Sequence, residues 1–438
     1  MKKIALISLG CSKNLVDSEV MLGHLNSSGY GFVPDPLDAD VVIINTCGFI
    51  QPAKDEAEDS INQILLHKKN NPSMKIIVTG CYVQRDEAQL KTTFPQVDSW
   101  LGVNDFDKIS SLIEDKPLSH RDRTFLYDHQ SPRIVTTSPF WAYVKISEGC
   151  SHQCSFCSIP LIKGPYQSRS IDSISEEVDQ LAALGIKEIN LISQDTTFFG
   201  RDLNTSTNLP NLLKKLLLID GIEWIRFLYC YPEEVTEELL DVMNEDKICS
   251  YLDIPFQHSH PRIIKSMRRG MSGKKALNFL DRIRQKLPDV AVRTSLITGY
   301  PEEGEEEFSH LVEFVKAAQF DHLGLFTYCQ EDGTTSSSLG DPVSPEEKKH
   351  RNEEIMEIQA EISFAKNSKY MNRTLDVLME KPDEEERGWI ARGRFQAPEV
   401  DGVVYVEQVQ ESGLRENPIR KVEIRERDVY DLYGVEIE

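Results

Sequence analysis

Three near-continuous apolar runs in the first 115 residues constrain the fold more than any other feature. The runs are KIALISLGC, DVVIINTC and KIIVTGC, and they end at Cys11, Cys47 and Cys81. Helical patterns over residues 16–27 and 53–69 separate them. Runs of Val and Ile that alternate with helices are typical of a parallel sheet covered on both faces. Residues 1–115 are therefore predicted to form an α/β domain.

The placement of these three cysteines favours a shared site. Consecutive cysteines are 36 and 34 residues apart, which corresponds to one strand–helix repeat each. Because ligand sites of parallel sheets lie beyond the carboxyl ends of the strands, the three thiols should converge. A lone cysteine of this kind is usually a core residue. Three cysteines at equivalent positions favour ligands of a metal cluster, with core thiols as the alternative.

Composition narrows the class of partner. The chain has 438 residues and a formal net charge of −22, which argues against binding nucleic acid through bulk electrostatics and favours a neutral or cationic partner. No apolar run is long enough to span a bilayer, and the run over residues 4–9 is too short for the core of a secretion signal. Nine cysteines without such a signal indicate a reducing compartment, so we expect a cytoplasmic protein that has no contact with membranes.

The remaining sequence divides into three segments. Residues 116–139 are polar and contain three prolines, which predicts a linker. Residues 140–365 hold six apolar strand patterns with helices between them, which predicts a partial (β/α) barrel with its site at the carboxyl ends of the strands. Residues 368–438 contain short alternating strands and turns, which predict a small all-β domain.

The stretch EGCSHQCSFCSIP follows the first strand of the predicted barrel and contains Cys150, Cys154 and Cys157. Zinc sites usually pair two C-x2-C units or add histidines, and His152 inside the run is not placed to close the same site. Ferredoxin spacings require a fourth cysteine, which this stretch lacks. Three thiolates can hold a four-iron cubane and leave one iron open to a substrate or cofactor, as the open position does in catalytic zinc sites.

This C-x3-C-x2-C run resembles the motif of the radical S-adenosylmethionine (SAM) enzymes, including the aromatic Phe156 before the last cysteine. With the amino-terminal triad added, the whole chain resembles the radical SAM methylthiotransferases. That resemblance implies an α/β protein with a flavodoxin-like amino-terminal domain (1–115), a partial (β/α)6 radical SAM barrel (140–365) and a small all-β, TRAM-like domain (368–438). 

The segment KGPYQSRS adds to the resemblance through Gly164, Ser168 and Arg169. Two features depart from the family pattern. Lys163 stands where family members commonly carry arginine, and the loop GYPEEG differs from the usual Gly-Phe-Pro-Gly-Glu-Thr turn. Neither departure affects a proposed iron ligand.

The resemblance also implies cofactors and a reaction. The open iron of one [4Fe–4S] cluster would bind SAM, and its reduced form would cleave SAM to a 5′-deoxyadenosyl radical. Such a radical can abstract hydrogen from a carbon that acid–base or nucleophilic catalysis cannot activate. The second [4Fe–4S] cluster would deliver sulfur, and a second SAM would supply the methyl group. The implied ligands are Cys150, Cys154 and Cys157 for the radical SAM cluster, and Cys11, Cys47 and Cys81 for the auxiliary cluster.

The segments ISQDTTFFG, YLDIPFQHSHPRI and DLYG resemble the RimO branch of this family. That branch methylthiolates the β-carbon of an aspartate in a small-subunit ribosomal protein, the twelfth of its series. A transfer RNA methylthiotransferase of the same family is the first alternative. A non-catalytic iron–sulfur redox protein is the second, but two three-cysteine sites oppose it. The electron donor and the sulfur donor stay unidentified.

Other polar residues are candidates for SAM binding. Gln194 and Asp195 end a predicted barrel strand, and Arg293 lies in an apolar strand from which it could bind a carboxylate. The alternatives are an Asp that caps a helix or turn, and a buried ion pair for Arg293. Gln257 and His258 also end a strand, where turn residues are the favoured interpretation. The cysteines are predicted only as cluster ligands, and the sequence identifies no catalytic residue.

The carboxy-terminal domain suggests how a substrate docks. Residues 368–438 contain 11 basic and 17 acidic residues, a formal charge of −6. A domain that grips RNA would need a basic face, because phosphate contacts dominate affinity for nucleic acid. Basic residues are concentrated in IRKVEIRER, where a solvated strand balanced by glutamates is the alternative. We therefore expect this domain to dock a basic ribosomal protein and do not expect direct RNA binding.

Overall fold

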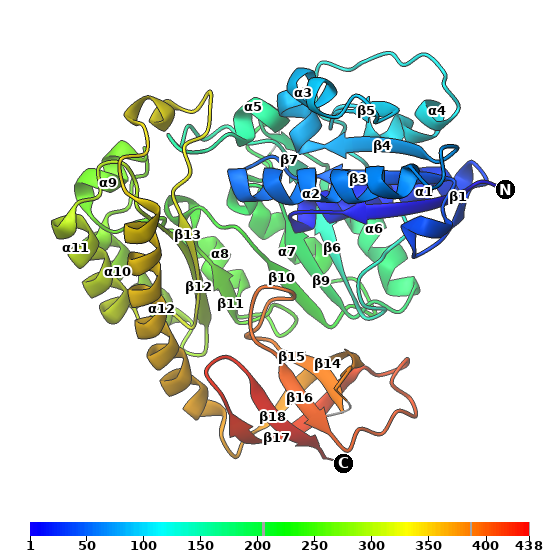
Figure 1. The fold of residues 1–438 in the computed structure, drawn as a ribbon. Coiled ribbons are helices and arrows are strands. Elements are labelled where there is room, and N and C mark those ends of the chain that lie inside the picture. Colours follow the sequence, from blue (N-terminus) through cyan, green and yellow to red (C-terminus); the bar gives the residue numbers. More distant parts are fainter. Residues whose placement is uncertain (204–205, 386–387, 438) are drawn as a thin grey trace.

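A five-stranded parallel sheet forms the amino-terminal part of the computed structural model, which describes residues 1–203, 206–385 and 388–437 (Figure 1). Its strand order β2-β1-β3-β4-β5 is that of flavodoxin-like sheets, which confirms the predicted fold class. The edge strands β2 and β5 escaped prediction because they have only two and three residues. The strands are β1 Lys3–Ser8, β2 Gly31–Phe32, β3 Val41–Thr46, β4 Lys75–Gly80 and β5 Ser99–Leu101.

Helices cover both faces of this sheet. Val41 and Ile43 of the central strand β3 belong to the core that includes α1, whereas Val42 and Ile44 belong to the core that includes α2. Side chains alternate between faces along a strand, so the fully buried β3 presents one apolar row to each layer. The helices are α1 Ser12–Ser27, α2 Gln51–Lys68, α3 Cys81–Thr93 and α4 Ile109–Ile113, with 3-10 turns η1 Pro36–Asp38 and η2 Phe106–Lys108.

Six parallel strands then form a partial barrel in the order β6-β9-β10-β11-β12-β13. A parallel bridge between Ile225 and Ile248 joins its two three-stranded halves. These are the six strands that the sequence predicts. Their bounds are β6 Trp141–Lys145, β9 Glu188–Ile192, β10 Trp224–Phe227, β11 Tyr251–Asp253, β12 Ala291–Thr298 and β13 His322–Thr327.

Helices pack on the outer face of the partial barrel. Gly185 follows the last turn of α6 with φ 96°, a left-handed conformation that suits a glycine after a helix end. The helices are α5 Ile159–Lys163, α6 Ile171–Ala183, α7 Leu209–Leu216, α8 Glu237–Val242, α9 Pro261–Ser266, α10 Gly273–Lys286, α11 Glu305–Ala318 and α12 Pro345–Asn367. Short elements between them are β7 Ser147–Glu148, β8 Gln167–Ser168, and the 3-10 turns η3 Thr196–Phe198, η4 Pro232–Glu234, η5 Thr335–Leu339 and η6 Ser368–Tyr370.

The carboxy-terminal part is a closed five-stranded barrel with the order β14-β15-β16-β18-β17. The sequence predicts its first four strands. The fifth, β18, closes the barrel by pairing with both β16 and β17, and it escaped prediction because its few apolar residues are interrupted by Gly434. The bounds are β14 Thr374–Pro382, β15 Trp389–Gly393, β16 Val404–Glu407, β17 Ile419–Arg427 and β18 Leu432–Glu436.

The segment over residues 116–139 contains no helix or strand, yet it packs closely against its neighbours. Arg133 donates hydrogen bonds to Glu19 of α1 at 2.6 Å and to Glu177 of α6 at 2.6 Å. The Tyr127 hydroxyl also bonds Glu177, at 3.0 Å. The segment therefore attaches the amino-terminal sheet to the partial barrel.

The loop between β15 and β16 reaches into the base of the partial barrel, where it is drawn in orange (Figure 1). Glu399 accepts a hydrogen bond from the Tyr143 hydroxyl at 2.8 Å, and Asp401 accepts one from the Tyr251 hydroxyl at 2.6 Å. Tyr143 belongs to β6 and Tyr251 to β11. The carboxy-terminal barrel is thus joined to the base of the partial barrel by polar contacts as well as by packing.

A buried ion cluster holds the same junction. Glu188 of β9 accepts hydrogen bonds from Arg226 of β10 at 3.0 Å and from Arg392 of β15 at 2.6 Å. Arg392 also bonds Glu380 of β14. Burial raises the pKa of Glu188, but the two guanidinium groups outweigh this effect and hold the pKa below its ordinary value.

Replacing Glu188 with Gln removes the central charge of this cluster. Both guanidinium groups would lose their shared carboxylate, and breaking a buried pair in this way typically costs about 3 to 5 kcal/mol. We expect calorimetry to show a clearly lower unfolding midpoint for Glu188→Gln at neutral pH. A group with a lowered folded pKa stabilises the protein above its unfolded pKa, and this contribution is lost as the pH falls through the folded pKa. The difference between the variant and the parent should therefore shrink in acid.

A control comes from the exposed pair between Lys214 and Glu238, whose side chains are 52% and 47% exposed. Glu238→Gln should change stability by less than about 1 kcal/mol, because exposed ion pairs contribute little. Equal effects of the two substitutions would show that the Glu188 cluster does not stabilise the junction.

Candidate functional site

Each of the three amino-terminal cysteines lies at the carboxyl end of a strand of the first sheet. Cys11 immediately precedes α1, Cys47 directly follows β3, and Cys81 directly follows β4. Gly10 has φ 87°, and a β-carbon there would lie 2.5 Å from that of Cys47. Only glycine allows the strand ends to approach in this way.

The charges of these three thiols influence one another. Burial and the Cys11 thiolate raise the pKa of Cys47 to about 11. Burial raises the pKa of the Cys81 thiol further, and the nearby Lys163 ammonium opposes the shift only in part. The three cysteines therefore share one neighbourhood, and binding a metal there would release protons from the thiols.

The second triad lies on a loop that follows β7. The short pairing between β7 and β8 closes the base of this loop, and the Cys150 amide donates to the Gly164 carbonyl at 3.1 Å. Burial raises the pKa of Cys150 to about 11 and that of Cys157 to about 12, and the neighbouring thiolates of the triad act in the same direction. Phe156 packs against the small core around Tyr300, which anchors the loop to the barrel.

Within the described residues, no three His, Cys, Asp or Glu side chains are arranged to hold a single metal ion. A cubane places a different demand on its ligands, because each thiolate binds its own iron and the three sulfur atoms need not meet at one point. Two sets of three cysteines without disulfides fit that demand in their chemistry, although Cys11 is exposed and Cys81 is buried while the other four are half-buried.

The two triads adjoin through α5. Ile162 of α5 packs with Cys81, and Ser158, which precedes α5, donates to the Phe49 carbonyl at 3.3 Å. The cysteine loop of the partial barrel therefore contacts the loops that carry Cys47 and Cys81. Both predicted sites consequently open onto the same region between the sheet and the partial barrel.

Four buried charged residues connect these parts. Lys145 of β6 forms ion pairs with Asp17 of α1 and, at 2.8 Å, with Glu148 of β7. Lys163 of α5 bonds the same two carboxylates at 3.1 Å and 3.2 Å. Burial raises the pKa of Glu148, but the two lysines outweigh it and lower the pKa overall. The departure from the family pattern at Lys163 thus falls in the cluster that joins the two domains.

The predicted SAM residues fall into two groups. The Gln194 amide donates to Glu148, which places it beside the second cysteine loop. Asp195 caps η3 by accepting from the Thr197 amide at 2.9 Å, and its other oxygen bonds His152 at 2.6 Å. Both therefore lie near the C-x3-C-x2-C loop.

Arg293 lies apart from that loop. It bonds Asp253 of β11 at 3.1 Å and lies 3.4 Å from Asp401, which belongs to the loop that enters the barrel base. Of the other two strand-end candidates, His258 is buried and bonds Glu303 at 3.0 Å, while Gln257 adopts a positive φ of 70°. These features fit structural roles, and the sequence favours turn residues for Gln257 and His258.

A stack of side chains beside Cys154 was not anticipated. The His152 ring stacks on Tyr231 with centroids 3.9 Å apart, and the Arg269 guanidinium lies 3.8 Å from the centroid of the same ring. Arg269 also lies 3.7 Å from the Cys154 sulfur. His152 could have been noticed because it interrupts the cysteine run, but no local signal marks Tyr231 or Arg269.

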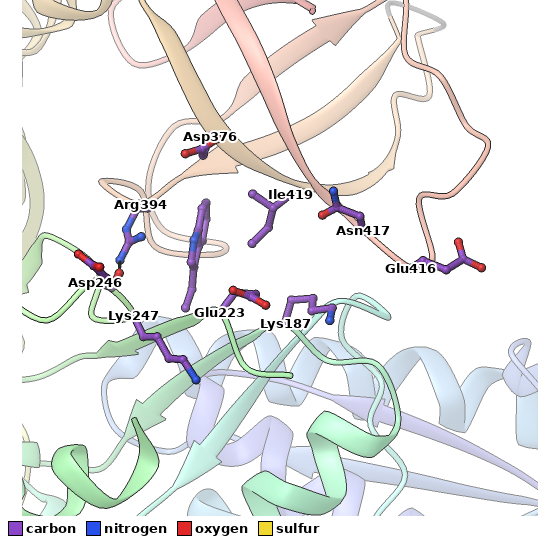
Figure 2. A pocket seen from close by; sticks show the side chains of 10 residues that line it. Lys187, Glu223, Asp246, Lys247, Asp376, Arg394, Glu416, Asn417 and Ile419 are labelled. Carbon is purple, nitrogen blue, oxygen red and sulfur yellow. Dashed lines mark hydrogen bonds between the residues drawn. The ribbon is translucent and has the colours of Figure 1, made fainter. Parts of the chain in front are cut away.

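The cavity drawn in Figure 2 lies elsewhere. It has a volume of about 570 Å³ and lies between the amino-terminal ends of β9 and β10 and the carboxy-terminal barrel. Acidic and basic side chains line it in mixed order, including Lys187, Glu223 and Arg394. Because the cysteines lie at the carboxyl ends of strands, this cavity is separate from both triads.

Comparison with known proteins identifies the three parts of the chain. Residues 3–102 match the uncharacterized protein family UPF0004, residues 144–315 the radical SAM superfamily, and residues 373–437 the TRAM domain. The ribosomal protein uS12 methylthiotransferase RimO of Dictyoglomus thermophilum is 42% identical over 439 residues, which cover 99% of each chain. The chain belongs to the RimO family. The RimO protein of Aquifex aeolicus is 43% identical and covers 100% of this chain and 98% of its own.

Solved structures add support for the fold alone. The radical SAM methyltransferase TsrM from Kitasatospora setae, with cobalamin and a [4Fe-4S] cluster bound, has a TM-score of 0.55 at 13% identity. The match covers 76% of this chain and 77% of TsrM. Among the residues that the structure describes, no helix is long and apolar enough to cross a membrane.

Membership of the RimO family confirms several predictions. The chain is a radical SAM methylthiotransferase, and the superfamily implies a [4Fe–4S] cluster and SAM. The predicted fold class of flavodoxin-like domain, partial (β/α)6 barrel and TRAM domain is also confirmed.

Proposed function

We propose that this chain attaches a methylthio group to the β-carbon of an aspartate in ribosomal protein uS12. The observation that carries the proposal is the meeting of two cysteine triads across α5 in a chain that RimO relatives match along its whole length. A sulfur-inserting enzyme needs a radical source and a sulfur source that reach the same carbon. Two adjoining triads meet that need, whereas a redox protein needs neither an open iron nor two such sites.

We assign the six cysteines to two [4Fe–4S] clusters. Cys150, Cys154 and Cys157 would hold the radical SAM cluster, and Cys11, Cys47 and Cys81 the auxiliary cluster. When bound, the clusters and SAM supply the radical, the sulfur and the methyl group. The chain contributes thiolates to each cluster and partly buries both sites, which limits access of water.

Gln194 and Asp195 are proposed to face bound SAM, because both contact residues of the second cysteine loop. Asp195 orients the His152 ring, and Gln194 orients Glu148, which is also fixed by two lysines. Arg293 was predicted for the same role. Its ion pairs with Asp253 and Asp401 favour the alternative, in which it fastens the carboxy-terminal loop to the barrel base.

The division into residues 1–115, 140–365 and 368–438 stays our proposal for the domains, with residues 116–139 as a packed connection.

We propose that the last domain docks uS12. Its strand β17 carries four basic residues, and each has a local partner: Lys421 pairs with Asp376 at 3.1 Å, Arg425 with Glu423 at 3.1 Å, Arg420 with Glu436 at 3.6 Å, and Arg427 bonds the Phe364 carbonyl. Three of these four cations are paired with carboxylates, which favours a protein partner over transfer RNA.

The substrate also suggests a location. Ribosomal proteins are made and assembled into ribosomes in the cytoplasm. Because the substrate is a ribosomal protein, we propose that this enzyme acts there. The strongly acidic chain would attract such a protein, since opposite charges raise association rates.

The ligand assignment predicts independent loss of the two clusters. Anaerobically reconstituted parent protein should bind two four-iron clusters. Replacing Cys150, Cys154 and Cys157 with Ala should remove one cluster, and replacing Cys11, Cys47 and Cys81 should remove the other, because each triad is a separate site. Iron and sulfide analysis with Mössbauer or EPR spectroscopy measures both results.

The same two variants separate the roles of the clusters. The variant without the amino-terminal triad should still form 5′-deoxyadenosine from SAM under reduction but transfer no sulfur. The variant without the second triad should form no 5′-deoxyadenosine. Stoichiometric zinc, one two-iron centre, or methylthiolated product from the first variant would contradict the assignment.

The substrate prediction is tested with both candidate acceptors in parallel. Reduced, reconstituted enzyme is incubated with SAM and either uS12 or transfer RNA, and mass spectrometry locates any methylthio group. We expect modification of one aspartate of uS12 and none of transfer RNA. Modified transfer RNA together with unmodified uS12 would replace this proposal by the transfer RNA alternative.

The docking proposal is tested in the turn between β14 and β15. Glu384 and Glu385 are exposed there, whereas Asp383 is buried and Glu386 lies outside the described residues. Reversing both exposed charges to Lys should slow association with uS12 by roughly 2- to 10-fold at low salt and weaken its salt dependence. Stopped-flow binding of the full-length chain measures this effect.

A matched control reverses two exposed acids of α12, Glu353 and Glu357. If this control slows association as much as the charge reversal at Glu384 and Glu385 does, only the net charge of the chain matters. If the charge reversal at Glu384 and Glu385 leaves association unchanged, the turn does not contribute to docking.

A further inference from the structure

Lys13 bridges the amino-terminal domain and the inside of the partial barrel. It lies in the first turn of α1, two residues after Cys11. Its Nζ atom lies 3.4 Å from the ring centroid of Tyr229, which follows the carboxyl end of β10. A cation from one domain thus reaches over an aromatic ring of the other, beside the first cysteine triad.

Lys13 lacks the counter-charge that its neighbours have. Lys145, Lys163 and Arg293 each form at least two ion pairs with carboxylates. No carboxylate of the described residues lies within ion-pair distance of Lys13, although its side chain is only partly exposed. Because no carboxylate in the described part of the chain contacts this ammonium directly, the position is suited to an anionic group that arrives with a ligand.

The partner ring is held in a strained conformation. Tyr229 has a positive φ of 63°, which non-glycine residues rarely adopt. Its amide donates to Asp253 at 3.0 Å, and Arg293 holds the other oxygen of that carboxylate at 3.1 Å. Backbone strain that the surroundings maintain is concentrated at ligand sites, and here it keeps the ring beneath Lys13.

The inner face of the barrel near Lys13 is only partly covered by protein. Arg293, Ser295 and Ile297 of β12 are only partly buried, whereas the residues between them are fully buried against the outer helices. A β-carbon at Gly324 of β13 would lie 3.0 to 3.6 Å from Arg293, Ser295 and Phe326, so these side chains share one face. Phe326 on that face is 48% exposed.

We propose that Lys13 binds the side-chain carboxylate of the target aspartate and selects aspartate over neutral residues. This inference rests on the proposed function. The β-carbon that receives sulfur is bonded directly to that carboxylate, so a cation that holds the carboxylate also positions the β-carbon. Because Lys13 follows Cys11 by two residues, it positions the carbon beside the triad assigned to sulfur delivery.

Another explanation is that Lys13 only balances the charge of a cluster at Cys11. The two explanations predict different effects of replacing Lys13. If Lys13 binds the substrate, its replacement should change the preference for the target side chain. If Lys13 is a counter-charge, its replacement should change the iron content and the midpoint potential of the cluster.

A double-mutant cycle on binding separates them. Parent enzyme and Lys13→Met, both anaerobically reconstituted, are titrated with uS12 that carries either the native aspartate or Asn at the target position. We expect Asp→Asn to weaken binding to the parent enzyme roughly 10- to 100-fold, as for the loss of one charge-assisted hydrogen bond. Lys13→Met should weaken binding of native uS12 to a similar extent, with little further loss for the Asn protein.

Two further variants serve as controls. Lys13→Arg should keep most of the preference for aspartate, because it keeps the charge. Lys91→Met removes an exposed lysine of α3 and should leave the preference unchanged. Iron content and midpoint potential of Lys13→Met should equal those of the parent.

Independent, additive effects of the two substitutions would overturn the proposal, as would loss of iron or a shifted potential with unchanged preference for aspartate. In those cases the parent enzyme still modifies uS12, so the proposed function stands. If the parent enzyme modifies transfer RNA and leaves uS12 unmodified, the proposed function fails and the role of Lys13 fails with it.

Discussion

The buried cluster of Asp17, Lys145, Glu148 and Lys163 is the interaction on which the rest of the structure depends. It contains two cations and two anions, and each lysine contacts both carboxylates, so no charge is left unpaired in the low-dielectric interior. Its members come from α1, β6, β7 and α5. Helix α1 directly follows Cys11, β6 and β7 lead into the loop that carries the second triad, and α5 follows that loop. The cluster therefore fixes the two thiol sites relative to each other.

The two ends of the partial barrel carry different groups: the thiol sites lie at one end, and the carboxy-terminal domain is attached at the other. Thiols and polar side chains lie at the carboxyl ends of the strands, whereas the TRAM domain is fastened to the base by the Glu188 cluster and by the loop that carries Asp401. This arrangement places the thiol sites at one end and a domain with a net negative formal charge at the other. Association and reaction can then be altered by different substitutions.

Local sequence patterns predicted most of the fold because its strands are near-continuous apolar runs. The six cysteines were also predictable, since their spacing reflects strand ends and a compact loop. Contacts that depend on tertiary structure could not be predicted from local sequence patterns. Lys163 and Asp17 are 146 residues apart, and nothing near either residue indicates the pairing. Arg269 and Tyr231 likewise reach Cys154 only through the curvature of the barrel. Strand β18 was missed because a short strand with a glycine has little apolar signal.

Helix α5 has only five residues, and it serves as a common wall for both thiol sites. Ile162 rests on Cys81, and Lys163 is tied to both domains by three buried contacts, with Asp17, Glu148 and Thr124. Neither thiol site can move away from the other without breaking these contacts. The spacing of the two sites is therefore built into the fold and does not depend on a ligand that holds them together.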